Sequence, residues 1–258
     1  MSEQRNIEFD TKEFNCVVEN GLAILTIKGN AFMSISSIAR NVDIIPWFDN
    51  VENEPSVKGI LVLNENDSMS DKAYIEFLKD IVGKEFDPDN PKQISHFEKG
   101  AVRTLEITIL SNLIRKFMSF RKLIIIGING EIVTPFFGLS LAADFRFASA
   151  DSSFIASHIK YMLHPSGALP FFLPMYVGKS KVTEILYRGD RILADELKSL
   201  GLINDVYPKD EYIKRIKEEA FNICKVSFSV VSSTKILLNR HKNELNNYLN
   251  LETDFFTR

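Results

Sequence analysis

Two continuous apolar runs constrain the fold of this chain more than any other feature. Residues 59–63 read GILVL and residues 123–130 read LIIIGING, and such runs are typical of strands that are buried on both faces. The stretch between them, AVRTLEITILSNLIRKFMSF (residues 101–120), has the amphipathic spacing of a long crossover helix. A buried strand, a helix and a second buried strand predict right-handed βαβ units around a parallel sheet, in the α/β class.

The flanking segments extend this pattern of strands and helices. Cys16 to Gly29 reads CVVENGLAILTIKG, where two β-rich runs flank Glu-Asn-Gly, so we expect an antiparallel hairpin. Residues 34–54, SISSIARNVDIIPWFDNVENE, place apolar side chains at helical spacing and predict a helix. From Leu186 onward the pattern is mostly helical. In DRILADELKSLGL we expect Asp190 to cap a helix that starts two residues later, and Gly201 to end it.

Composition and charge narrow the class of protein. The 258 residues carry a formal net charge of -3, and the Lys and Arg residues are scattered among acids, so nucleic acid is not an expected partner. No apolar run reaches the roughly 18 residues that span a bilayer, and the start, MSEQRNIEFDTKEF, is polar. Cys16 and Cys224 lie far apart and predict neither a disulfide framework nor a zinc site. We therefore expect a cytoplasmic protein without a membrane partner.

The turn after the second apolar run is bulky. Residues 129–149 read NGEIVTPFFGLSLAADFRFAS, so Pro135, Phe136 and Phe137 stand where the chain passes from a predicted strand into a predicted helix. Turns that feed a helix and approach a ligand usually carry glycine, because only glycine leaves room for another backbone or a bound oxygen atom. The sequence therefore raises the question of why proline and phenylalanine side chains occupy this turn.

Several motifs together carry a resemblance to a known family. They are the NG of residues 129–130 with the following LSLAADFRFAS, the HPSG around Pro165, the VGKS of residues 177–180 and GDRILADELKSLGLINDVYP of residues 189–208. In order and spacing they resemble the crotonase family, the enoyl-CoA hydratase and isomerase superfamily. The resemblance implies a crotonase-like spiral of ββα units over residues 1–200 and a helical C-terminal trimerisation region over residues 201–258. It also implies a homotrimer or a hexamer.

The family's chemistry depends on two backbone N–H groups that hold the thioester oxygen of an acyl-CoA as negative charge develops on it. By resemblance, the first donor position falls nearest Ser70, whose amide remains available for the role. The second falls on Pro135, which has no N–H to donate. Phe136 adds aromatic bulk at the same turn. The resemblance therefore assigns Ser70, Pro135, Phe136 and Gly138 to the oxyanion and acyl-binding region.

The two catalytic acids of the family's hydratases match Gly138 and His158, so neither matched position carries a carboxylate. His158 is the best single candidate for an acid or base near neutral pH. The alternative is that His158 is a hydrogen-bonded wall residue. His164 is a weaker second candidate. Asp144 and Arg146 belong to a D-x-R segment and are expected to pair within the scaffold.

Two functional hypotheses from different classes remain open. The first is an atypical enzyme of the lyase or isomerase kind that acts on an acyl-CoA or an acyl-carrier thioester, with His158 as acid or base and the Ser70 amide as donor. The second is a catalytically degenerate crotonase-fold protein that binds acyl groups or serves as a partner subunit. For both we expect no metal and no cofactor, with a coenzyme A thioester possible as the substrate or ligand. Packed phenylalanine around Pro135 and His158 would favour the second hypothesis, and an open polar pocket the first.

Overall fold

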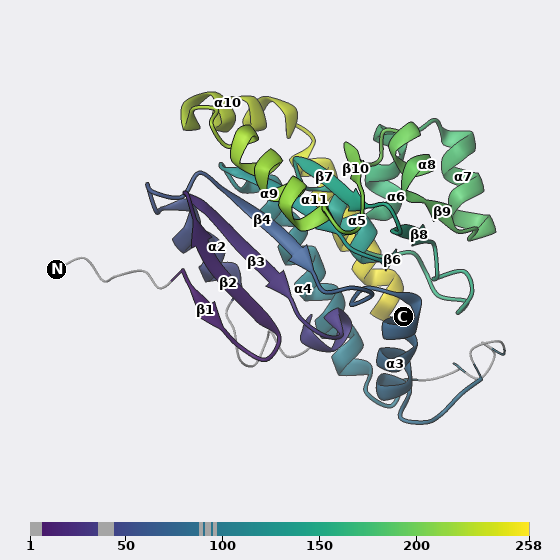
Figure 1. Cartoon of the computed structure of the whole chain (residues 1–258). Helices are drawn as coiled ribbons and strands as arrows, with labels where there is room; N and C mark the ends of the chain where they lie inside the picture. Colours follow the sequence, from purple (N-terminus) through teal and green to yellow (C-terminus); the bar gives the residue numbers. More distant parts are fainter. Residues whose placement is uncertain (1–6, 36–43, 88–89, 91–93, 95–96, 258) are drawn as a thin grey trace.

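The computed structural model describes residues 7–35, 44–87, 90, 94 and 97–257. Within these residues the main sheet has seven strands (Figure 1). In sheet order they are β1 (Phe9–Asp10), β2 (Phe14–Glu19), β3 (Leu22–Ile27), β4 (Gly59–Asn64), β5 (Leu123–Ile128), β7 (Phe145–Ser149) and β10 (Asp205–Tyr207). From β3 to β10 every neighbouring pair is parallel. The α/β class and the two buried strands predicted from the apolar runs are confirmed.

The predicted hairpin is present as β2 and β3, which pair antiparallel over their full length. Its turn residues, Asn20 and Gly21, have φ angles of 49° and 79°. A two-residue hairpin turn of this kind needs positive φ at both positions, which asparagine and glycine adopt most readily. The local sequence Glu-Asn-Gly therefore accounts for the turn.

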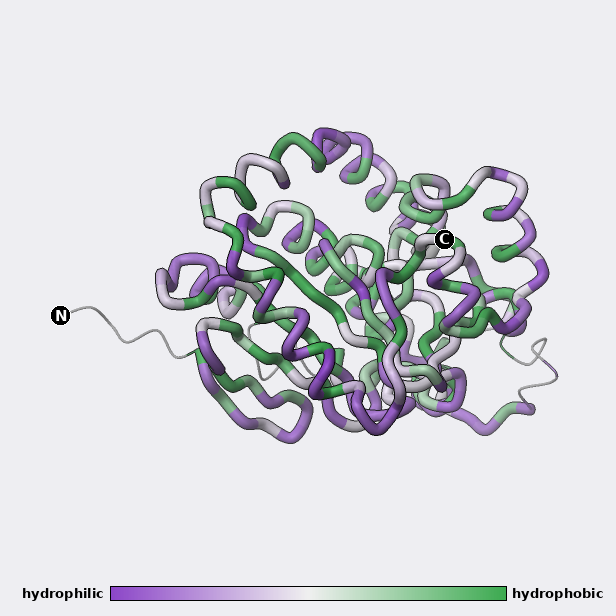
Figure 2. The backbone as a smooth tube through the Cα atoms, turned by 45° about the horizontal axis from the view of Figure 1, so that its top comes forward, coloured by the Kyte–Doolittle hydropathy of each residue, from purple (hydrophilic) through white to green (hydrophobic). Residues whose placement is uncertain are grey.

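Helices cover both faces of the main sheet (Figure 1). One face packs on α2 (Ile44–Glu52) and α4 (Gly100–Ser119), while α3 (Asp71–Val82) and α5 (Phe136–Leu141) contact α4 and β6 (Glu131–Val133). The other face packs on α9 (Tyr212–Ile223) and the start of α10 (Phe228–Leu238). Figure 2 shows the strands between these layers as mostly hydrophobic. The predicted crossover helix of residues 101–120 is confirmed as α4, whereas residues 36–43 of the helix predicted at 34–54 lie outside the described residues.

A smaller sheet of three strands lies within the described residues, formed by β6 (Glu131–Val133), β8 (Ser153–Ile155) and β9 (Ile192–Leu193). The segment between β8 and β10 adds α6 (Leu169–Phe172), η2 (Leu173–Met175), α7 (Lys179–Arg188) and α8 (Ala194–Ser199). The expectation that Asp190 caps a helix is wrong. Residues 192–193 form β9 instead, α8 starts at Ala194, and the Asp190 carboxylate pairs with Arg188 at 2.7 Å. Gly201 follows the end of α8 with a φ of 71°, as a helix-ending glycine should.

The last part of the chain is mostly helical, as the sequence indicates. After β10 come α9, α10 and α11 (Lys242–Thr257), and α11 packs along α4. Strand β10 lies beyond residue 200 and still pairs with β7, so the main sheet draws on both predicted regions. No single described helix is long and apolar enough to cross a bilayer. Helices α9 and α10 reach that length and composition only together, across a 95° bend.

Candidate functional site

Of the predicted site residues, Phe136 lines a pocket at the edge where the parallel strands β3, β4 and β5 end. Carboxyl ends of neighbouring parallel strands are the usual place for a ligand in α/β folds. At this edge the Asn64 amide group donates to the Asn129 carbonyl at 2.9 Å, and its oxygen accepts from the Asn129 N–H at 3.0 Å. Asn64 therefore fixes the end of β4 against the turn that follows β5. Sequence reasoning did not single out this asparagine, although it directly follows the apolar run GILVL.

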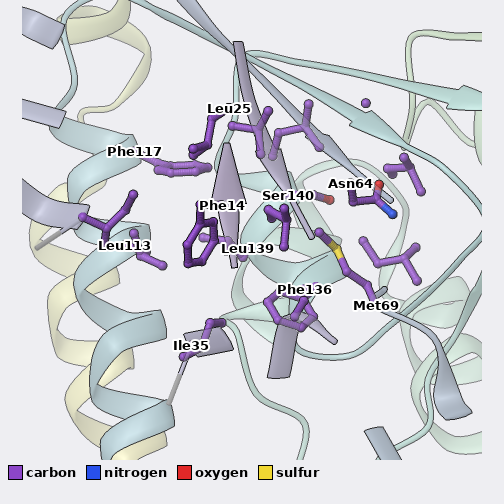
Figure 3. Close-up of a pocket in the computed structure, with 18 of the residues that line it drawn as sticks. Phe14, Leu25, Ile35, Asn64, Met69, Leu113, Phe117, Phe136, Leu139 and Ser140 are labelled. Carbon is purple, nitrogen blue, oxygen red and sulfur yellow. The ribbon is translucent and has the colours of Figure 1, made fainter. Parts of the chain in front are cut away.

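An apolar pocket of about 70 Å³ lies beneath this edge (Figure 3). Its lining combines the strand ends with α2, α4 and α5. The residues labelled in Figure 3 are Phe14, Leu25, Ile35, Asn64, Met69, Leu113, Phe117, Phe136, Leu139 and Ser140. The polar side chains in the lining are Asn64 and Ser140, and the Ser140 hydroxyl donates to the Phe137 carbonyl at 2.6 Å. Both polar groups are thus already bonded within the protein, so the pocket suits an apolar guest.

Ser70 is the N-cap of α3. Its hydroxyl oxygen accepts from the Ala73 N–H at 3.2 Å, a standard arrangement for a serine at a helix start. Its own N–H donates to the Asp67 carbonyl at 3.1 Å. The amide proposed as an oxyanion donor is therefore engaged within its loop, and its role as a donor stays a prediction.

Pro135 directly precedes α5, and its carbonyl accepts from the Leu139 N–H at 3.0 Å. Lacking an N–H, it offers an acyl oxygen no hydrogen bond. The next two side chains point in different directions. Phe136 lines the apolar pocket (Figure 3), while Phe137 stacks on Phe154 with ring centroids 4.1 Å apart. The bulk in the NGEIVTPFFG turn therefore fills the space between the pocket and the second sheet.

Gly138 packs against the turn that follows the HPSG motif. A Cβ atom at Gly138 would lie 2.3 Å from the Gly167 carbonyl oxygen and 2.8 Å from the Leu169 nitrogen. A Cβ atom at Gly167 would in turn lie 2.1 Å from the Pro135 carbonyl oxygen. The two backbones thus touch directly. The position that matches a catalytic acid in the family has no room here for any side chain.

His158 is buried, with 5% of its surface exposed. Its Nδ1 lies 3.3 Å from the Thr134 hydroxyl, and the ring also bonds to the backbone of Leu186. Burial lowers the pKa of His158 to about 4, so the imidazole is uncharged at neutral pH. Its ring nitrogens are occupied by scaffold groups, and it does not contribute to the lining of the apolar pocket. This arrangement favours the wall-residue interpretation, and a catalytic role for His158 stays a prediction.

Asp144 and Arg146 serve the scaffold, as expected from their D-x-R segment. The Asp144 carboxylate accepts from the Ile124 N–H at 2.7 Å and from the Lys235 ammonium at 2.6 Å. The Arg146 guanidinium donates to the carbonyls of Leu202 and Ala143, each at 2.8 Å. Both residues therefore tie β7 to neighbouring segments.

One buried acid near the site escaped sequence reasoning. Glu252, on α11, accepts from the Gly167 N–H at 2.9 Å and the Ala168 N–H at 3.1 Å, and it also bonds to Tyr248. Burial raises the pKa of Glu252 to about 7. It lines a 170 Å³ pocket with His164 and Phe255, separate from the apolar pocket. The sequence around it, LNLETDFF, gives no sign of burial, because only the docking of α11 on α4 places it inside.

No group of three His, Cys, Asp or Glu side chains in the described part of the chain is placed to hold a metal ion. The polar side chains that line the apolar pocket are Asn64 and Ser140. The arrangement can hold an apolar chain. It lacks a free backbone donor at Pro135 and a carboxylate at either matched acid position.

Comparisons with known proteins agree with this architecture. A family model described as enoyl-CoA hydratase/isomerase matches residues 72–258. A probable peroxisomal enoyl-CoA hydratase 1 from Arabidopsis thaliana is 26% identical over 235 residues, which cover 91% of this chain and 81% of the relative. A crotonyl-CoA hydratase from Syntrophomonas wolfei is 23% identical over 243 residues, covering 92% and 86%.

Solved structures show the same fold. An enoyl-CoA hydratase from Mycobacterium avium subsp. paratuberculosis aligns with a TM-score of 0.74 at 17% identity, over 96% of this chain and 94% of that chain. An enoyl-CoA hydratase from Bacillus halodurans aligns with a TM-score of 0.73 at 17% identity, over 95% and 94%. The low identities show that the chain has diverged from these relatives. Because the family model covers most of the chain, this protein belongs to the enoyl-CoA hydratase/isomerase family, the crotonase superfamily, as a divergent member.

Proposed function

We propose that this protein binds the acyl group of a coenzyme A or acyl-carrier thioester and does not hydrate it. The observation that carries the proposal is the start of α5. There Pro135 offers no N–H, Phe136 lines the pocket and Gly138 is packed against the Gly167 backbone. Hydration by this family's chemistry needs two backbone donors and two carboxylates. The protein thus corresponds to the acyl-binding, catalytically degenerate hypothesis.

The residues present support binding of an apolar chain. Moving a CH₂ group from water into an apolar pocket is worth about 0.8 kcal/mol. Phe136, Met69 and Leu113 supply such surface at the strand edge, and Asn64 holds the surrounding turns in place. The names of the relatives, a crotonyl-CoA hydratase among them, support a thioester as the ligand class.

The test compares turnover with binding. Crotonyl-CoA is incubated with the purified protein, and loss of the conjugated double bond is followed by ultraviolet absorbance, with a hydratase of the family as positive control. We expect no turnover above background, because loss of general acid and base assistance costs a factor of about 10² to 10⁴ for each role. Calorimetry should detect butyryl-CoA binding that is tighter than binding of free CoA. Turnover at an ordinary enzymatic rate of about 1 to 10³ s⁻¹ would overturn the proposal.

We further propose that the protein assembles as a homotrimer or a hexamer through its C-terminal helices. Helix α10 exposes a set of large apolar side chains, each 54–75% accessible: Val230, Ile236, Leu237 and Leu238. Beside them lies a groove of about 490 Å³ lined by α10, η2 and the end of α5. Exposed apolar side chains beside such a groove support an interaction site, and further copies of this chain are the occupants we propose.

A further inference from the structure

The apolar pocket is small. A dry apolar cavity of about 150 Å³ accommodates benzene, with six carbon atoms. The pocket beneath the strand edge measures about 70 Å³. By the same scale it holds about three carbon atoms. An acyl chain seated there would extend about three carbons beyond its thioester carbonyl.

An aromatic wall closes the pocket on the side of α5. The ring of Phe136 meets the ring of Phe32 edge to face, with centroids 4.7 Å apart. Phe32 in turn lies 4.8 Å from Tyr74 and 5.9 Å from Phe77. All four side chains are buried. A close-packed interior of this kind does not accommodate a further methylene without strain, so the cluster behind Phe136 keeps the pocket from widening on this side.

The lining also excludes charge. Asn64 and Ser140 are its polar side chains, and both already bond to backbone groups of the protein. A carboxylate or hydroxyl at the end of the acyl chain would therefore lose its water without gaining a partner.

We infer that this site accepts only short, uncharged aliphatic acyl groups of about four carbon atoms or fewer, and that Phe136 sets the limit. The inference rests on the proposed acyl-binding function and specifies the length and charge of the acyl groups that bind. Phe136 is well suited to this role because its ring lines the pocket directly and packs against the buried ring of Phe32.

The experiment measures the dissociation constants of acetyl-, butyryl-, hexanoyl- and octanoyl-CoA by calorimetry, with free CoA as reference. For the unmodified protein we expect about a fourfold gain per added CH₂ from acetyl to butyryl, and no gain beyond. Succinyl-CoA, which has four carbons and a terminal carboxylate, should bind at least tenfold more weakly than butyryl-CoA.

The decisive variant is Phe136→Ala, which opens the space of about one benzene ring on the α5 side of the pocket. It should continue the fourfold gain per CH₂ to hexanoyl- and octanoyl-CoA. Phe137→Ala is the matched control, since Phe137 is equally buried on α5 but stacks on Phe154 outside the pocket. It should keep the preference of the unmodified protein. If Phe136→Ala does not fold, Phe136→Leu should still raise hexanoyl-CoA affinity by a smaller factor.

The outcomes separate the inference from the function on which it rests. If the unmodified protein gains affinity steadily up to octanoyl-CoA, or binds succinyl-CoA as well as butyryl-CoA, the size and charge limits are wrong and acyl binding stands. If Phe137→Ala changed the dependence of affinity on acyl-chain length as much as Phe136→Ala does, Phe136 would not be the residue that sets the limit. If every thioester binds no better than free CoA, the proposed function itself fails.

Discussion

At Gly138 the backbone of α5 and the backbone of residues 167–169 approach too closely for a side chain to stand between them. A Cβ atom would lie 2.3 Å from the Gly167 carbonyl oxygen, and backbone cannot swing aside as a flexible side chain can. We therefore predict that Gly138→Ala lowers the free energy of unfolding by about 3 kcal/mol, the upper part of the range for overpacked interiors. Urea denaturation of the variant and of the unmodified protein measures this difference in the free energy of unfolding.

Gly100→Ala is the control for this prediction. Gly100 is the first residue of α4, and a Cβ atom there would meet nothing within 4 Å. Alanine is also the better helix former, so this variant should be at least as stable as the unmodified protein. If Gly138→Ala were equally well tolerated, the two backbones would have to be further apart than described, and a catalytic acid at this position would become feasible.

His158 gives the second prediction at the residue scale. Its pKa of about 4 in the folded protein lies below the ordinary value of 6.5, because burial disfavours the charged ring. The folded state thus prefers the neutral form. Its contribution to stability is fully present above pH 6.5 and is lost as the pH falls through 4. The loss amounts to about 3 kcal/mol at 1.36 kcal/mol per pKa unit.

The measurement is the free energy of unfolding at pH 7.5 and pH 4, for the unmodified protein and for His158→Gln. Taking the difference between the two proteins at each pH cancels the titration of other groups. The unmodified protein should lose about 3 kcal/mol relative to the variant on acidification. A difference that does not change with pH would mean that His158 is more accessible to water than its burial indicates.

At the scale of an element, Glu252 couples helix α11 to the site. Its carboxylate bonds the Gly167 and Ala168 N–H groups, and Gly167 touches the turn at Pro135. Burial raises the pKa of Glu252 to about 7 from 4.5, so the folded state prefers the protonated form. The stability it contributes is fully present below pH 4.5 and is lost as the pH rises through 7.

We therefore predict opposite pH behaviour for Glu252 and His158. The unmodified protein should lose about 3 kcal/mol relative to Glu252→Gln between pH 4.5 and pH 8, because glutamine resembles the protonated acid and does not titrate. Unfolding titrations at the two pH values test this. An unchanged difference for Glu252→Gln would place the carboxylate in contact with water.

At the scale of the whole molecule, the exposed apolar face of α10 predicts assembly. Light scattering should give the mass of a trimer or a hexamer at micromolar concentration. Leu237→Glu should shift the protein toward the monomer, since Leu237 is 75% exposed and a charge there would be desolvated in an interface. Leu193→Glu, at an exposed leucine on β9, should leave the mass unchanged. A monomeric unmodified protein would contradict the proposed assembly.

Local sequence determined the elements of this protein. The runs GILVL and LIIIGI form buried parallel strands because continuous apolar residues suit a sheet covered on both faces. Asn20 and Gly21 form the hairpin turn because they adopt positive φ easily. Short-range rules failed at Asp190, where residues 192–193 pair with β8 and form a strand. Pairing with a distant strand there outweighed the local helix signal.

Only the tertiary structure decided the state of the site. That Pro135 offers no N–H follows from the sequence, since the residue type alone removes the donor. The lack of space at Gly138 comes from contact with Gly167, and the low pKa of His158 comes from burial. Glu252 reaches the site from 85 residues beyond Gly167. Exclusion of water and backbone contact depend on segments distant in sequence, and no local pattern encodes them.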